Sequence, residues 1–232
     1  MLKKNTYFTK GETALWTSSV ILIIASFFAF DRENYLTLSA SLTGVTSLIL
    51  CAKGNPAGQL LIVIFSVMYG IISFSFAYYG EMITYLGMTA PMALLSLVSW
   101  LKNPFSKDSP EVRINRLGKS EVIFAVLLTA AVTLPFFFIL RTFNTANLLP
   151  SVMSVSTSFF AVYLTFRRSA YYALAYAAND IILIVLWFMA SMSDSSYISV
   201  LICFAVFLVN DIYVFFSWKK MWLRQNGTGR LS

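Results

Sequence analysis

Residues 170–192 read AYYALAYAANDIILIVLWFMASM, a long and nearly continuous apolar run. A helix needs about 20 mostly apolar residues to cross a hydrocarbon core of about 30 Å, and this run has that length. The pair Asn179-Asp180 interrupts it near the middle. A carboxylate at that depth costs about 2.5–3.5 kcal/mol to insert, so it normally faces a bundle interior or a wet cavity. The stretch therefore predicts a transmembrane helix with one functional face.

A second pair, Asn210-Asp211, lies in the apolar run 197–217. Tyrosines accompany both pairs at helical spacing, with Tyr172 and Tyr176 before the first and Tyr213 after the second. The two runs together predict a polar, aromatic-lined site inside a membrane bundle.

The composition agrees with an all-α membrane protein. The chain is 58% hydrophobic and only 12% charged, whereas a soluble domain carries about 25% charged residues. We expect eight transmembrane helices, which leave no room for a sizeable soluble domain. They cover residues 13–30, 36–52, 58–79, 82–101, 122–140, 147–166, 170–192 and 197–217.

The positive charges define the orientation. With both termini inside, all of the 17 Lys and Arg residues except Arg32 and Arg141 fall on the inner side. This asymmetry is the positive-inside pattern of membrane proteins. The net charge of +7 is therefore a topology signal, and it does not indicate a nucleic-acid partner.

The chain contains a weak internal repeat. Two blocks of three spans end in similar segments, Ser99-Trp-Leu-Lys102 and Ser217-Trp-Lys-Lys220. Since three is an odd number of spans, the span 122–140 between the blocks gives both copies the same orientation. We expect an extra N-terminal helix (1–35), a first three-helix bundle (36–103), a loop and linker helix (104–146), a second bundle (147–220) and a cytoplasmic tail (221–232). Parallel repeats that hold a substrate between them are a known transporter plan.

Several polar stripes are candidate ligand contacts. Tyr172, Tyr176, Asn179 and Asp180 share one helix face, and Gln59 and Tyr69 lie on a stripe of the third span. Amides and carboxylates can bind sugar hydroxyls, tyrosine faces stack on flat rings, and a carboxylate favours a cationic ring. These residues could instead serve helix packing. Stripes of hydroxyl residues commonly do so in membrane proteins, and the two Asn-Asp pairs could hydrogen-bond to each other.

Prolines, glycines and cysteines add secondary expectations. Pro91 predicts a kink or a hinge, and Gly44, Gly70 and Gly87 predict close helix approach. The inner loop 102–120 has the composition of a solvated connector. With two cysteines, both in apolar spans, and no histidine, neither a disulfide nor a metal site is expected, and no cofactor.

In order and spacing, these segments resemble the PnuC family of bacterial vitamin transporters, the full-length relatives of SWEET sugar transporters. The segments that carry the resemblance are YGIIS (69–73), YGE (79–81), PM (91–92), SWLKNP (99–104), YYALAYAAND (171–180), VNDIY (209–213) and Trp218.

The resemblance implies a SWEET-like 3-1-3 fold in the bacterial plasma membrane, expected as a homo-oligomer, a trimer. It implies import of nicotinamide riboside, a precursor of NAD, by facilitated diffusion with alternating access. A cytoplasmic kinase would then trap the product by phosphorylation. The implied substrate-binding residues are Gln59, Tyr69, Tyr172, Tyr176, Asn179, Asp180, Asn210, Asp211 and Tyr213.

One departure keeps other cargoes open. Family members commonly carry tryptophans at the start of the seventh span, where this chain has Tyr171, Tyr172 and Tyr176. Thiamine, riboflavin and (deoxy)nucleosides are the alternative substrates, and proton coupling through Asp180 or Asp211 is the alternative mechanism. A structural or sensory membrane protein is a further alternative. The sequence does not favour an enzyme, because it lacks histidine, a Cys–base pair and a phosphate-binding glycine loop.

Overall fold

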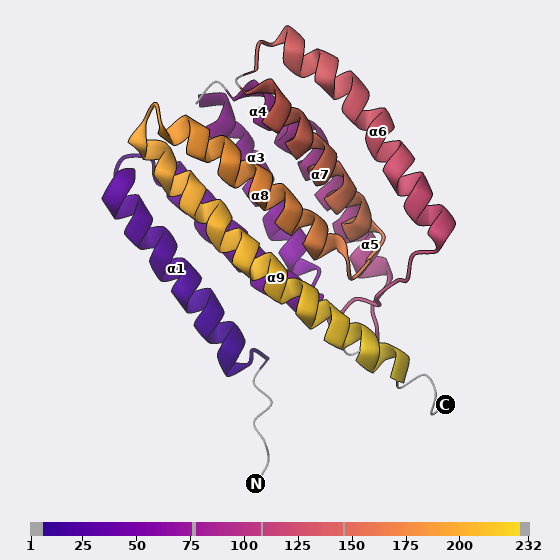
Figure 1. Ribbon diagram of the computed structural model, residues 1–232. Coiled ribbons are helices and arrows are strands. Elements are labelled where there is room, and N and C mark those ends of the chain that lie inside the picture. Colours follow the sequence, from indigo (N-terminus) through magenta and orange to yellow (C-terminus); the bar gives the residue numbers. More distant parts are fainter. Residues whose placement is uncertain (1–6, 76–77, 108, 146, 228–232) are drawn as a thin grey trace.

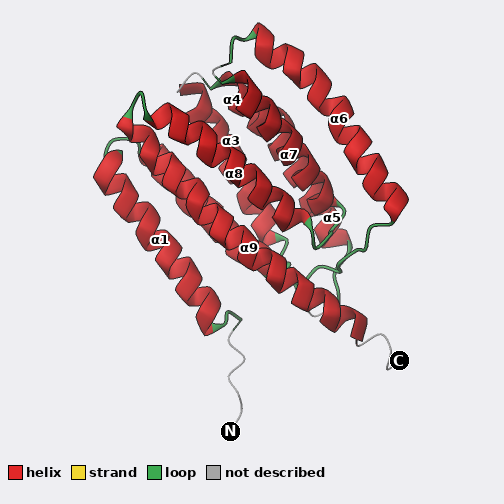
Figure 2. Ribbon diagram, viewed as in Figure 1, coloured by secondary structure: helices red, strands yellow, loops and turns green. Residues whose placement is uncertain are grey.

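The protein is a bundle of long helices joined by short loops (Figure 2). The computed structural model describes residues 7–75, 78–107, 109–145 and 147–227. The helices are α1 (Lys10–Phe30), α2 (Tyr35–Ala52), α3 (Ala57–Ser75), α4 (Tyr79–Thr84), η1 (Tyr85–Thr89), α5 (Ala90–Lys102), α6 (Lys119–Thr142), α7 (Leu148–Phe166), α8 (Tyr172–Ser191), η2 (Ser195–Tyr197) and α9 (Ile198–Gly227).

Within the described residues, eight helical stretches are long and apolar enough to cross a membrane, as the sequence predicted. Their bounds differ from the predicted spans mainly at α9, which continues to Gly227. The tail expected from residue 221 therefore begins as helix, and its Met221 is buried. These helices carry many exposed large apolar side chains, as expected of a surface that contacts lipid.

The fourth span consists of three segments, because Pro91 interrupts its hydrogen bonding. Proline has no backbone N–H and its ring crowds the carbonyl four residues earlier. The helix widens just before Pro91 into the π-helical turn η1, where the Ala90 N–H donates to the Tyr85 carbonyl. Such turns are frequent at functional sites, and Tyr85 is buried in the core.

Six helices close a ring in the order α2, α3, α5, α7, α8, α9 and back to α2, each packed on the next. The helices α1 and α6 lie outside this ring, on opposite sides of the molecule (Figure 1). The first packs on α2 and α9, and the second packs on α7. The interior of the ring is therefore lined by both halves of the chain.

The two ends of the ring differ in charge. Helix α1 begins and α9 ends at the same end of the bundle (Figure 1), which we call the basic end. Lys53 and Arg224 lie at this end in ion pairs with Glu12 and Glu111, and Arg168 donates there to the Arg113 carbonyl. We call the opposite end, where Asp31 meets Ser199 at 3.4 Å, the far end.

The interpretation of the loop 102–120 as a solvated connector is wrong for its centre. Val112 and Ile114 are buried. The Val112 N–H donates to the Gly54 carbonyl at 2.9 Å, and the Ile114 N–H donates to the Gln225 side chain at 2.9 Å. The connector thus crosses the basic end of the ring and joins both halves.

Two of the three glycines allow close helix approach. A Cβ added to Gly44 would lie 2.3 Å from the ring of Phe207 on α9, and one added to Gly70 would lie 2.5 Å from Leu86. The expectation for Gly87 is wrong, because its nearest neighbour would be Ile83 at 3.9 Å.

Candidate functional site

The two mid-span aspartates meet inside the ring. Asp180 of α8 and Asp211 of α9 are 3% and 2% exposed, and their carboxyl groups lie close enough to interact directly. We call these two residues the acid pair.

Tyrosine, amide and thiol groups surround this pair. Tyr172 and Tyr176 interact electrostatically with Asp211, and their rings meet edge to face with centroids 6.2 Å apart. Cys51 also interacts with Asp211, and it accepts a hydrogen bond from Gln59 at 3.4 Å. Five predicted site residues, from α3, α8 and α9, thus lie around one centre.

An aromatic cluster closes the ring toward the basic end. Its members are Trp100, Tyr172 and Trp218, each at most 1% exposed. The ring of Tyr172 packs edge to face on Trp218 at 4.8 Å and on Trp100 at 6.3 Å. We call these three residues the basic-end aromatic cluster.

A second aromatic cluster lies toward the far end and is formed by Tyr69, Tyr78, Tyr85 and Trp187. The indole N–H of Trp187 donates to the Tyr69 hydroxyl at 2.6 Å, and the rings of Tyr69 and Tyr85 lie 4.4 Å apart. We call these four residues the far-end aromatic cluster. Tyr85 interacts electrostatically with Asp180, so the cluster borders the acid pair.

A third carboxylate, Glu81 of α4, is fully buried next to this cluster. It interacts with the Ser154 hydroxyl of α7, but neither of its oxygens accepts a hydrogen bond of normal length from the described residues. It also interacts with Tyr69 and Tyr85. An acidic group therefore lies between the acid pair and the far end.

The orientation of Asn179 is fixed by α7. Its Oδ1 atom accepts hydrogen bonds from Thr157 at 2.9 Å and from Ser158 at 3.0 Å. Two donors on one oxygen determine which way the amide points. The side chain is 2% exposed and lies beside Asp180 in the chain.

Two of the nine predicted residues face α1 and lie away from the acid pair. Asn210 donates to Ser19 of α1 at 3.0 Å and to the Val206 carbonyl at 2.8 Å. Tyr213 donates its hydroxyl to Glu12 of α1 at 3.0 Å, and Lys53 pairs with the same carboxylate at 2.8 Å. These residues anchor α1 to the ring.

Several buried polar atoms on the helices of the ring have no hydrogen-bonding partner among the described residues. They are one oxygen of each aspartate, the Tyr172 hydroxyl, and the hydroxyls of Ser66, Ser73 and Ser96. Buried polar groups of native proteins are nearly always paired, with protein, water or ligand. A hydroxylated solute in the ring would provide these partners.

The predicted site did not include Glu81, Tyr85 or Trp187, which the structure places beside the predicted residue Tyr69, although Tyr85 lies on a polar stripe of the fourth span. Glu81 lies at the start of an apolar span, where a carboxylate costs little and carries no signal of burial. Trp187 lies two turns beyond Asp180 on the same face of α8, and that spacing could have identified it.

Comparison with known proteins agrees with this architecture. Residues 34–220 match the family described as "Nicotinamide mononucleotide transporter". The nicotinamide riboside transporter PnuC of Neisseria mucosa is 25% identical over 92% of this chain and 83% of its own length. The PnuC of Haemophilus influenzae is 21% identical over 89% of both chains.

A solved structure, described as the crystal structure of the vitamin B3 transporter PnuC, has the same fold. It superposes with a TM-score of 0.83 at 21% identity and covers 94% of each chain. The chain is therefore a multi-pass membrane protein and belongs to the PnuC family of nicotinamide mononucleotide and nicotinamide riboside transporters.

Proposed function

We propose that this protein imports nicotinamide riboside across the bacterial plasma membrane. The names of its relatives support this cargo, and the charge of the core supports it independently. The buried residues of the described chain include Glu81, Asp180 and Asp211 but no Lys or Arg, and the sequence has no His. This one-sided charge is the observation that carries the proposal.

The same charge distinguishes the riboside from the mononucleotide. The pyridinium ring of nicotinamide riboside is a cation, and a buried carboxylate attracts it. A mononucleotide adds a phosphate with a charge of about −1.5 to −2, which would meet three buried acids with no buried base. Purified protein should therefore bind the riboside and discriminate strongly against the mononucleotide, as measured by calorimetric titration with both. Equal affinity for the two ligands would contradict the proposal.

In the proposed complex the acid pair faces the pyridinium ring, and the ribose hydroxyls bind Asn179 and Gln59. Tyr172, Tyr176 and Tyr69 provide aromatic surfaces on the two sides of the ring. We assign Asn210 and Tyr213, the remaining two candidates, an indirect role through α1, because their hydrogen bonds go to Ser19 and Glu12.

We further propose that the ring consists of two parallel three-helix repeats, α2–α3–α5 and α7–α8–α9, in a SWEET-like 3-1-3 arrangement with α6 as the linker and α1 as the extra helix. The order of contacts around the ring supports this, because exchanging the two halves reproduces the same order. With both termini in the cytoplasm, the basic-end aromatic cluster is the inner gate. The far-end aromatic cluster is then the outer gate, and the two open alternately.

Transport is proposed to be downhill, with a cytoplasmic riboside kinase trapping the product. Vesicles that contain the purified protein should equilibrate labelled riboside without accumulating it, and enclosed kinase with ATP should convert equilibration into accumulation. Accumulation without a kinase and without an ion gradient would contradict facilitated diffusion.

Proton coupling is the second candidate mechanism, and the close approach of the buried Asp180 and Asp211 carboxyl groups favours it, because two such groups readily share a proton. A cation that displaces the shared proton would exchange one positive charge for another. This candidate predicts that a pH gradient drives accumulation in vesicles without a kinase. Equilibration that is unchanged by the gradient would exclude it.

The acid pair would also accept thiamine, which is a cation, whereas riboflavin and deoxynucleosides are uncharged competitors. A thermal-shift panel of the four compounds distinguishes them: stabilisation by thiamine with none by nicotinamide riboside would reassign the cargo.

We also propose that the protein is a homo-oligomer, a trimer. The mass of the detergent-purified protein tests this.

A further inference from the structure

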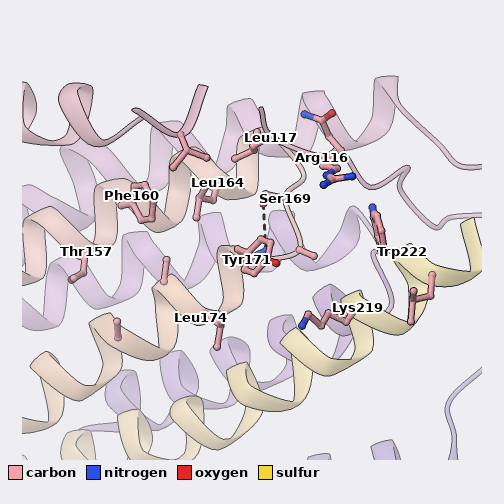
Figure 3. A pocket seen from close by; sticks show the side chains of 16 residues that line it. Arg116, Leu117, Thr157, Phe160, Leu164, Ser169, Tyr171, Leu174, Lys219 and Trp222 are labelled. Atoms are coloured by element: carbon pink, nitrogen blue, oxygen red, sulfur yellow. Dashed lines mark hydrogen bonds between the residues drawn. The ribbon is translucent and has the colours of Figure 1, made fainter. Parts of the chain in front are cut away.

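A groove of about 980 Å³ lies on the outside of the ring at its basic end. Its walls are the end of the connector and the start of α6 on one side and the last turns of α9 on the other, and α7 and α8 form its floor (Figure 3). The small side chains of Ala170, Ala175 and Ala178, in and just before α8, leave space above the floor of the groove. The groove is separate from the acid pair inside the ring.

The chemistry of the groove changes along its length. Arg116, Lys219 and Trp222 gather at one end, whereas Phe160 and Thr157 lie toward the other (Figure 3). Between them the lining is mainly aliphatic, with Leu164, Leu174 and Val122 among its members. Among the described residues, those that line the groove include no acid.

The two cations at the mouth are available to an anion. Arg116 and Lys219 are exposed, and neither forms an ion pair within the described chain. Lys219 lies over the ring of Phe215 at 5.0 Å, which holds its ammonium group beside Tyr171. The mouth therefore presents two positive charges next to aromatic surface.

The depth of these residues matches a lipid headgroup. At a rise of about 1.5 Å per residue, α9 spans about 30 Å between Ile198 and Lys219, which equals the thickness of a hydrocarbon core. Lys219 thus lies at the boundary between lipid and water, where Trp and Tyr side chains also concentrate. The aliphatic part of the groove lies below this boundary, at the depth of acyl chains.

We propose that this groove binds one anionic glycerophospholipid from the leaflet at the basic end. Its phosphate pairs with Arg116 and Lys219, and an acyl chain lies over Ala175 and Ala178 toward Phe160. Basic pockets between transmembrane helices on the cytoplasmic side are known to bind anionic headgroups. A hydrophilic ligand would suit the basic mouth of the groove but not its aliphatic lining. A lipid without a negative charge would leave Arg116 and Lys219 unpaired.

The bound lipid also contacts Thr157, a residue that orients Asn179 inside the ring. Thr157 lines the deep end of the groove and donates the hydrogen bond that orients Asn179. The lipid fills the space between α6 and α8 beside this contact, so we expect it to stabilise the packing of α7 on α8.

Native mass spectrometry of the full chain tests the proposal, with phosphatidylglycerol and phosphatidylcholine of identical acyl chains as the probes. The wild type should retain one phosphatidylglycerol in preference to phosphatidylcholine. The Arg116→Gln/Lys219→Gln variant should lower that preference about thirtyfold, which corresponds to about 1 kcal/mol for each basic residue. Lys102→Gln/Lys107→Gln is the matched control, because it removes the same charge at the same end outside the groove.

A third variant tests the apolar part. Ala178→Trp fills the exposed floor without removing charge and should lower retention of both lipids. Its melting temperature should also gain less from added phosphatidylglycerol than that of the wild type. Equal retention of the two lipids by the wild type overturns the proposal, as does an equal loss of preference in the groove and control variants. If Ala178→Trp leaves lipid retention intact and disrupts an oligomer, the groove is a subunit contact and the proposal fails.

Discussion

The indole rings of Trp100 and Trp218 lie with their centroids 5.2 Å apart, and each belongs to a different half of the chain. Trp100 of α5 donates to the Thr165 carbonyl of α7 at 3.0 Å, and Trp218 of α9 donates to the Cys51 carbonyl of α2 at 2.7 Å. The serine before each tryptophan donates to the next carbonyl of the same partner helix, Ser99 to Phe166 and Ser217 to Ala52. The two Ser-Trp segments thus make matched contacts, each with the opposite half.

The tryptophan contacts should hold the basic end together. Trp100→Phe and Trp218→Phe each keep an aromatic ring but remove a donor, so the Thr165 or Cys51 carbonyl keeps only its backbone donor. We expect each substitution to cost about 0.5–1.5 kcal/mol and to lower the melting temperature of the detergent-purified protein. In a double-mutant cycle the two losses should not add, because the rings touch. Strict additivity would show that the two sites are independent.

The acid pair should determine binding of a cationic substrate. Asp180→Asn/Asp211→Asn removes both carboxyl groups, and with them the negative charge of the pair, while it keeps the shape of the two side chains. A hydrogen bond to a charged group contributes about 1.5–3 kcal/mol, so the dissociation constant for nicotinamide riboside should rise by about tenfold or more. Asp194→Asn is the control, because Asp194 is exposed in the loop before η2. Unchanged affinity in the double variant would contradict the assignment of the site.

Removing the donors to Asn179 should weaken binding without unfolding the protein. Thr157→Val and Ser158→Ala together free the Asn179 Oδ1 atom, so the amide can rotate away from the ribose hydroxyls. We expect about tenfold weaker riboside binding, equivalent to about one hydrogen bond, with a smaller change in melting temperature. Thr129→Val is a suitable control, because that hydroxyl donates only to the Ala125 carbonyl within α6.

The attachment of α1 should depend on Glu12. This buried carboxylate accepts hydrogen bonds from the Thr9 N–H at 2.7 Å and the Tyr213 hydroxyl at 3.0 Å, and it pairs with Lys53. Glu12→Ala removes all three contacts and should cost about 1–3 kcal/mol, since Lys53 retains partial access to water. Protease cleavage near residue 33 should become faster, as followed by gel electrophoresis. Glu33→Gln, an exposed acid beside the same loop, should leave the rate unchanged.

Gly44 and Gly87 give opposite expectations for alanine. Gly44→Ala places a methyl group against Phe207 at the contact of α2 with α9, and overpacking of this kind costs about 1–3 kcal/mol. Gly87→Ala meets only Ile83 and should be neutral or stabilising. Melting temperatures of the two variants, measured side by side, test whether the halves are in contact at Gly44. Equal effects would contradict it.

The sequence predicted the helices because a bilayer sets the length of a span and water-exposed segments carry the charge. It also predicted that Asp180 and Asp211 face inward, since a carboxylate is costly among acyl chains. Periodicity could not assign Asn210, because adjacent helical residues point about 100° apart and α1 provides a polar partner on the outer side. Local composition could not reveal that Val112 and Ile114 are buried, since their partners lie in distant parts of the chain.

Two neighbouring residues of α9, Asn210 and Asp211, connect helix α1 outside the ring to the core of the ring. Asp211 faces Asp180 inside the ring and Asn210 faces Ser19, so α1 must follow any turn of α9 about its own axis. The N-terminal helix is thus a natural position for a spectroscopic reporter. A fluorophore or spin label on its exposed surface would register motion of α9 from outside, without touching the residues proposed to bind the cargo.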